Sequence, residues 1–126
     1  MKIQSQSLSP LVTLFTLEGE FDVNDKPQVM AGLEAAAAEG AKWLLFDMSR
    51  VSFIDSVAVG TLIRAAKTVT PQQGDVAVIA PQPAVLRVFE ISGTKELLNV
   101  VGSVEEALVR LKVPQQASEA DGEVQK

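Results

Sequence analysis

Hydrophobic and polar residues recur with two different periods along this chain, and the two periods predict β-strands that alternate with helices. Residues 2–8 and 11–18 alternate with a period near two and predict a pair of strands joined by a turn. Residues 42–48 form the most hydrophobic run, with apolar side chains on both faces, which is typical of a central strand. Two further strands are predicted over residues 75–80 and 97–101.

Apolar residues spaced three and four apart predict four helices between and after these strands. The first runs from an N-cap at Asn24 to about Glu39, and the second follows Ser56. The third spans residues 83–91, and the fourth opens with a capping box at residues 103–106. Strands that alternate with helices predict an α/β fold, here a single domain with a mixed β-sheet of about four to five strands and about four α-helices.

The length of 126 residues suits one domain with one buried core. We expect the folded domain to cover residues 1–113 and residues 114–126 to form a disordered acidic and polar tail, because the tail lacks large apolar side chains. No uncharged apolar stretch approaches the ~20 residues that span a bilayer, and the first residues lack the apolar core of a secretory signal. These features predict a soluble cytoplasmic protein with no direct membrane insertion.

The absence of three residue types limits the chemistry that the chain can carry out. It has no histidine, no cysteine and no tyrosine, which excludes Ser–His–Asp and Cys–His catalysis and the common zinc sites. The net charge of −5 opposes binding to the phosphate backbone of nucleic acids. We therefore expect a protein that is not an enzyme, binds no metal or cofactor of its own and has no nucleic-acid partner.

Ser56 is the most informative residue of the chain, because it stands where a hydrophobic segment meets an amphipathic helix. The apolar pair Phe53-Ile54 delivers Asp55-Ser56 to the helix N-terminus. In one interpretation Ser56 is an N-cap, a role worth roughly 1 kcal/mol. In the other it accepts a phosphate, which the free amides and the helix dipole favour and which adds about −1.5 to −2 charges at neutral pH. A capping serine that is also modified satisfies both.

Asp47 ends the predicted central strand and suggests a second kind of phosphoacceptor. An aspartate in this place resembles that of a response-regulator receiver domain, which also needs an acidic pair after its first strand and a lysine after its last. The acidic residues here, within residues 18–22, follow the second strand instead, and no lysine is suitably placed after the last one. We therefore expect Asp47 to accept hydrogen bonds from turn amides around Ser49 and Arg50.

The loop before the first helix carries two polar residues of interest, Asp22 and Asn24. If the sheet is built as predicted, this loop lies on the same edge as the turn that carries Ser56. Capping of the helix accounts for Asn24. Asp22 is then an exposed acidic residue beside Ser56, and we predict that it takes part in partner recognition.

Four segments, in order and at matching spacing, resemble the STAS domain family, and within it the bacterial anti-sigma-factor antagonists. They are GEFD at residues 19–22, FDMSRVSFIDS at 46–56, PAVLRVFEISG at 83–93 and SVEEAL at 103–108. The likeness covers about residues 3–112. Several motifs together make this resemblance specific, and it implies an α/β fold of the STAS type.

The resemblance implies a regulatory switch. In this family the unphosphorylated antagonist binds an anti-sigma factor that is also a serine kinase, and so releases the sigma factor. The kinase uses its own ATP and magnesium to phosphorylate the serine after Phe-Ile-Asp, which here is Ser56, and a serine phosphatase resets the system. The predicted partner-binding residues are Asp22, Asn24, Asp55, Ser56, Val57 and Ala58.

The chain departs from the family pattern directly after Ser56. Family members usually continue Asp-Ser-[Ser/Thr]-Gly-Leu, whereas residues 55–59 read DSVAV. The second hydroxyl is lost at Val57, and a methyl group replaces the glycine at Ala58, which predicts a drier and bulkier surface. The departure leaves open a second function, that of a STAS scaffold or accessory module in a stressosome-type or lipid-transport complex, which binds without phosphorylation.

Overall fold

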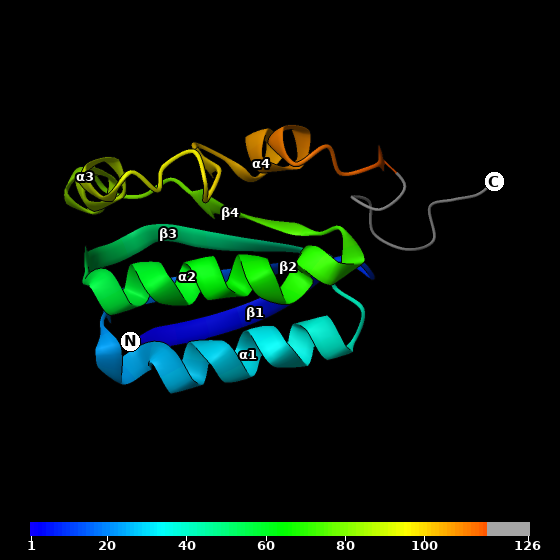
Figure 1. Cartoon of the computed structure of the whole chain (residues 1–126), viewed down its shortest axis with the longest axis horizontal. Coiled ribbons are helices and arrows are strands. Elements are labelled where there is room, and N and C mark those ends of the chain that lie inside the picture. The colour runs from blue at the N-terminus through cyan, green and yellow to red at the C-terminus, as the bar shows by residue number, and fades with distance from the viewer. Residues whose placement is uncertain (116–126) are drawn as a thin grey trace.

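A five-stranded mixed β-sheet forms the centre of the protein in the computed structural model, which describes residues 1–115 (Figure 1). The strands are β1 (Lys2–Ser9), β2 (Val12–Phe21), β3 (Trp43–Ile54), β4 (Asp75–Ile79) and β5 (Val100–Val101), and they lie in chain order across the sheet. β1 pairs antiparallel with β2, whereas the other neighbouring strands pair in parallel. The predicted α/β fold with a mixed sheet is confirmed. From residue 116 onward, the predicted tail lies outside the described residues.

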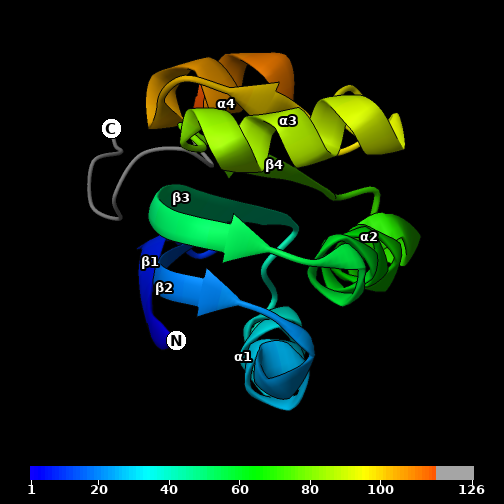
Figure 2. The same ribbon diagram turned by 90° about the vertical axis from the view of Figure 1, so that its left-hand side faces the viewer.

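Within residues 1–115, four α-helices and two 3₁₀ helices connect the strands. The α-helices are α1 (Lys26–Ala38), α2 (Ser56–Val69), α3 (Pro83–Ser92) and α4 (Val104–Arg110), and the 3₁₀ helices are η1 (Val23–Asp25) and η2 (Thr70–Gln72). Figure 2 shows α1 and α2 side by side along one face of the sheet, with α4 toward the opposite face. None of the described helices is both long and apolar enough to cross a bilayer.

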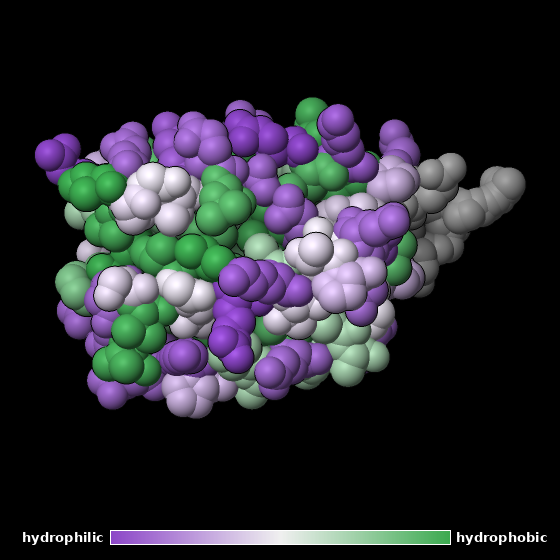
Figure 3. Space-filling view, viewed as in Figure 1, coloured by the Kyte–Doolittle hydropathy of each residue, from purple (hydrophilic) through white to green (hydrophobic). Residues whose placement is uncertain are grey.

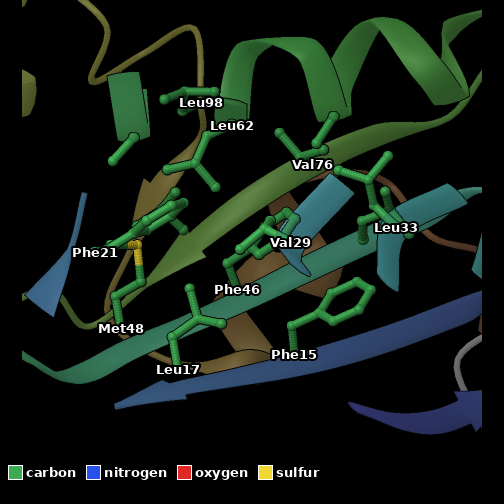
Figure 4. Close-up of a cluster of buried hydrophobic side chains, with 14 of the residues drawn as sticks. Phe15, Leu17, Phe21, Val29, Leu33, Phe46, Met48, Leu62, Val76 and Leu98 are labelled. Atoms are coloured by element: carbon green, nitrogen blue, oxygen red, sulfur yellow. The ribbon is translucent and has the colours of Figure 1, made fainter. Parts of the chain in front are cut away.

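Two apolar clusters hold the helices against the sheet, because β3 is covered on both faces. Phe46 belongs to the cluster under α1 and α2, where its ring stacks on Phe15 with centroids 5.1 Å apart (Figure 4). Its neighbour Leu45 points to the other side and packs with Ala107 of α4. Residues 43–46 are therefore all buried, as expected of the central strand that the hydrophobic run predicts.

β3 is longer than predicted, because it continues past Asp47 to Ile54 in place of the expected loop. Val51 and Ile54 are buried while the residues between them are exposed, so the extension keeps an inward and an outward side. β2 extends with it to Phe21, and the two extensions pair through two register shifts. Gly19, with a φ of +112°, lies at one of these irregularities, where glycine adopts the conformation without strain.

β5 is shorter than the strand predicted over residues 97–101. Asn99 has a φ of +52°, a left-handed conformation that interrupts an extended strand, and its side-chain amide donates to Val76 O at 2.9 Å. Residues 95–99 therefore form a turn, and the strand is confined to Val100–Val101.

Parallel pairing of β2 and β3 determines where the candidate residues lie. Phe21 and Ile54, the last residues of the two strands, are register partners. Because parallel strands end at the same edge of a sheet, the segments that follow them, η1 and the start of α2, lie next to each other. In Figure 2 the arrowheads of β2 and β3 point in the same direction, toward the side of the sheet where α1 and α2 lie. The predicted proximity of the two segments is confirmed.

Candidate functional site

Ser56 is the first residue of α2, and its side chain is exposed. The residue that caps the helix is Asp55, which has extended backbone angles (φ −113°, ψ −177°) and accepts at Oδ1 from the Ala58 amide at 2.9 Å. The interpretation of Ser56 as the N-cap is therefore wrong, because the carboxylate one residue earlier takes that place. Among residues 1–115 the Ser56 hydroxyl has no hydrogen-bond partner.

Asp55 also connects the two adjacent segments. Its second carboxylate oxygen, Oδ2, accepts from the Val23 amide of η1 at 3.2 Å. The two donor residues, Val23 and Ala58, are 35 positions apart in the sequence, yet one half-buried carboxylate accepts from both. The turn that carries Ser56 and the loop after β2 are thus bonded to each other through Asp55.

Asp22 caps η1. Its Oδ1 atom accepts from the Asn24 amide at 2.9 Å, and Asp25 Oδ2 accepts from the Asp22 amide at 3.0 Å, so the two carboxylates form a capping box. Contrary to the prediction, Asn24 is not the N-cap of α1 but lies inside η1 with its side chain exposed. The chain approaches α1 through a 3₁₀ turn that begins at Val23, so the N-cap position of α1 falls on Asp25, and the side-chain cap, Asp22, belongs to η1.

The carboxylates at this edge of the sheet differ in how far they face solvent. Asp25 is buried, and its Oδ1 atom lies 3.3 Å from the α-amino group of Met1. Asp22 and Asp55 are half-buried, and each is used by backbone amides. Asp22 is therefore not the freely exposed acidic residue that the sequence predicts, because capping of η1 holds its carboxylate against the loop.

Two exposed apolar residues at this edge were not predicted from the sequence. Val23 is 54% exposed and Phe53 is 49% exposed, and we call this pair the apolar rim. Phe53 could have been found by alternation, because it directly precedes the buried Ile54 and therefore points to the opposite side of the strand. Nothing in the local pattern marks Val23. Figure 3 shows apolar surface at the left-hand end of the molecule, the end where α2 begins.

The two residues after Ser56 differ in their exposure. Val57 is partly exposed, whereas Ala58 is fully buried with 0% exposure and belongs to the cluster under α2. The predicted placement of Ala58 on a partner-binding surface therefore needs correction: the third residue of α2 faces the sheet, on the same side as Leu62 and Ala65. The departure from the family pattern changes the surface at Val57 and the packing at Ala58.

Asp47 has the structural role that the sequence predicts. Its Oδ1 atom accepts from the Ser49 amide at 3.0 Å and from the Ser49 hydroxyl at 2.8 Å. The carbonyl of Ser49 in turn accepts from the side-chain amide of Gln82, before α3, at 3.0 Å. Within residues 1–115 no three acidic side chains are grouped so that they could hold a metal ion.

The fold and this serine-bearing edge define the class of protein: the chain belongs to the STAS domain family, whose sequence pattern matches residues 5–107. Among its relatives is the anti-sigma-B factor antagonist of Listeria monocytogenes, 27% identical over 82 residues, which cover 65% of this chain and 72% of that protein. The anti-sigma-B factor antagonist of Staphylococcus aureus is 26% identical over 82 residues, covering 65% of this chain and 76% of its own. The family predicted from the motifs is confirmed.

Solved structures give the same result for the fold. The anti-sigma factor antagonist SpoIIAA in its unphosphorylated form superposes with a TM-score of 0.75 at 25% identity, over 88% of this chain and 96% of that one. The phosphorylated form of SpoIIAA, a Bacillus cell fate determinant, gives a TM-score of 0.68 at 23% identity, over 86% of this chain and 98% of that one. The chain thus has the fold of SpoIIAA along nearly its whole described length.

Proposed function

We propose that this protein is an anti-sigma-factor antagonist that works as a phosphorylation-controlled partner switch in the cytoplasm. In its unphosphorylated form it binds an anti-sigma factor that is also a serine kinase, so that the sigma factor is released. Phosphorylation of Ser56 by that kinase ends the binding, and a serine phosphatase restores it. Relatives such as the anti-sigma-B factor antagonists of Listeria monocytogenes and Staphylococcus aureus support a regulatory role.

The observation that carries the proposal is the free hydroxyl of Ser56. Because Asp55 caps α2, Ser56 Oγ is exposed and is not needed to hold the helix. A kinase can therefore transfer the γ-phosphoryl group of its own ATP to this oxygen without first breaking an internal hydrogen bond. An O–P bond forms at Ser56, the bond between the β- and γ-phosphates breaks, ADP leaves, and the hydroxyl proton passes to the kinase.

The surroundings of Ser56 explain why a phosphate would end binding. A phosphoserine adds about −1.5 to −2 charges at neutral pH. It would stand next to the Asp55 carboxylate and close to the apolar rim, in a chain whose net charge is already −5. A partner that covers this edge would have to desolvate the dianion beside another carboxylate, which opposes association.

A binding and labelling experiment tests this proposal. The Ser56→Ala variant serves as bait to recover the kinase from lysate, and the purified kinase is then incubated with wild-type protein and ATP. We expect one phosphate, which mass spectrometry places on Ser56. The matched control is Ser52→Ala, which removes an exposed serine hydroxyl from β3 and should leave labelling of Ser56 unchanged. Labelling at another residue, or none in the wild-type protein, would contradict the proposal.

Binding by two charge variants tests the switch itself. We expect Ser56→Ala to keep wild-type affinity for the kinase and Ser56→Asp to bind at least about tenfold more weakly, which corresponds to about 1.4 kcal/mol. Equal affinity of the two variants would refute the electrostatic explanation.

One observation favours a second function, a STAS scaffold or accessory module that binds its partner constitutively. Val57 is partly exposed where the family usually has a second hydroxyl, so the surface beside Ser56 is more apolar than the family pattern. A stressosome-type or lipid-transport complex would use such a surface without phosphorylation. Recovery of an assembly without a kinase, with equal affinity for Ser56→Ala and Ser56→Asp, would favour this function over the switch.

A further inference from the structure

Asp55 joins the loop after β2 to the start of α2, because its two carboxylate oxygens accept from backbone amides of these two segments. From its geometry we infer that Asp55 is a positioning residue: its carboxylate fixes η1, and with it the exposed Val23 of the apolar rim, relative to Ser56. The link to partner recognition rests on the proposed function. The internal role of Asp55 rests only on hydrogen bonds within the protein.

The first step is the use of both carboxylate oxygens. Oδ1 accepts from the Ala58 amide at 2.9 Å and Oδ2 accepts from the Val23 amide at 3.2 Å. Each oxygen is thus engaged by an internal backbone donor, and the side chain is half-buried. These two bonds use about half of the acceptor sites of an ionised carboxylate and fix its orientation. The geometry therefore supports a positioning role for Asp55 in addition to the partner contact that the sequence predicts.

The second step is what the bond to Val23 holds in place. The amide of Val23 belongs to η1, whose capping box is closed by the carboxylates of Asp22 and Asp25. Within residues 1–115, the bond from Val23 to Asp55 is the hydrogen bond that joins η1 to the turn carrying Ser56. Without it, the loop would still be attached through β2, α1 and the ion pair of Asp25 with the α-amino group of Met1, but it would have no hydrogen bond to the Ser56 turn.

The third step links this position to recognition. Val23 is 54% exposed, so its side chain lies on the surface while its amide is bonded inward to Asp55. Phe53, the other member of the apolar rim, comes two residues before Asp55 on β3. A kinase that docks on the rim and phosphorylates Ser56 would contact residues from two segments, η1 and the end of β3. Asp55 sets the distance between those segments before the partner arrives, which lowers the ordering cost of binding.

Hydrogen exchange of the Asp55→Asn variant tests the internal part of the inference. Asparagine is as good an N-cap as aspartate, but its side chain has an NH2 group in place of the second carboxylate oxygen. One of the two amides that Asp55 serves would therefore face a donor instead of an acceptor. We expect the amide of Val23 to exchange about tenfold faster than in the wild type, while the amide of Ala58 keeps its protection. If the side chain turns the other way, Ala58 exchanges faster instead, which still shows that one carboxylate serves both amides. Unchanged protection of both would overturn the inference.

A pair of variants at Val23 tests the link to recognition without altering Asp55. Val23→Pro removes the donor N–H at the first position of η1, where proline is compatible with the backbone, and it keeps three side-chain carbons. Val23→Ala keeps the donor and removes two exposed carbons, so it shows the effect of the side chain alone. With the kinase recovered by the Ser56→Ala bait, we expect Val23→Pro to raise KM for this protein about tenfold over Val23→Ala, with kcat within about twofold. A residue of purely structural importance would lower the melting temperature and leave this KM difference at zero.

The outcomes separate this inference from the proposed function. If the wild-type protein is not phosphorylated, the proposed function fails, and the exchange of the Val23 and Ala58 amides still decides whether Asp55 fixes the loop. If the wild type is phosphorylated and both Val23 variants have equal KM values, the proposed function stands and the positioning role of Asp55 is overturned.

Discussion

The residue after Val57 offers a quantitative test of which side of α2 faces the sheet. Ala58 is fully buried in the third position of the helix, where the family usually has glycine. Ala58→Gly removes one buried methyl group, worth about 0.8 kcal/mol, and places glycine in a helix, which costs about 0.8–1.0 kcal/mol relative to alanine. We therefore expect the free energy of unfolding to fall by about 1.5–2 kcal/mol. Because the side chain is not on the surface, the rate of Ser56 phosphorylation in the folded protein should stay within about twofold.

Urea unfolding followed by circular dichroism gives this free energy, with an unchanged m-value as the sign that the folded state is otherwise intact. Gly60 supplies the control in the same helix: it is exposed, and a Cβ added there meets no atom within 4 Å. Gly60→Ala should therefore stabilise the protein by up to about 1 kcal/mol. Equal stability of Ala58→Gly and wild type, or a change in phosphorylation with Ala58→Gly but none with Val57→Ser, would refute this assignment of the buried and exposed positions.

Three further changes test the packing that supports the site. Gly74→Ala would place a Cβ in collision with Lys42 O, a backbone atom that cannot move freely, so thermal unfolding should show a loss of about 3 kcal/mol or more, or no folded protein; a wild-type melting temperature would contradict this contact. Phe46→Ala removes a buried ring that stacks on Phe15, and we expect a loss of about 3–5 kcal/mol in urea unfolding, with a loss below 1 kcal/mol as the contrary result. Ser103→Ala removes the N-cap of α4 and should cost about 1 kcal/mol, without effect on labelling of Ser56.

The order of strands and helices follows from the sequence, because periodicity reports directly which side chains are buried. The run at residues 42–48 is apolar on both faces and becomes the central strand. The capping box at α4 was also predicted, although Glu106 accepts from the amide of Gly102 and not from that of Ser103. The order and type of the main strands and helices were thus predicted correctly, whereas the extension of β3 and the turn at residues 95–99 were not.

The helix starts were less predictable, because several neighbouring residues are equally good caps. Asp22 and Asn24 lie two positions apart and are equally good N-cap residues, so only the backbone angles decide which of them caps a helix. The same holds for Asp55 and Ser56, where the extended backbone falls on the aspartate. The prediction of the phosphoacceptor does not depend on this choice, since Ser56 reaches the helix N-terminus in either case.

The remaining differences arise from tertiary contacts. The extension of β3 to Ile54 requires β2 to pair with it through two register shifts, and the local sequence of β3 does not indicate this pairing. The bond from Val23 to Asp55 spans 32 positions of the chain and depends on that pairing. The site could therefore be located from the sequence, but the contact that assembles it could not.

The unequal lengths of the strands divide the sheet into a five-stranded body and a two-stranded end segment, here called the arm, whose inward side chains pack in the cluster under α1 and α2. β4 pairs with β3 only as far as Asp47 and Ile79, whereas β2 stays paired with β3 up to Phe21 and Ile54. Ser56 is thus mounted at the end of a two-stranded ribbon, which by itself is a marginal structure in water. Substitutions in the five-stranded body should therefore change the global free energy of unfolding, whereas substitutions in the arm should first change the local stability of the turn that carries Ser56. The local stability of this segment can accordingly be changed by substitution without altering the five-stranded part of the sheet.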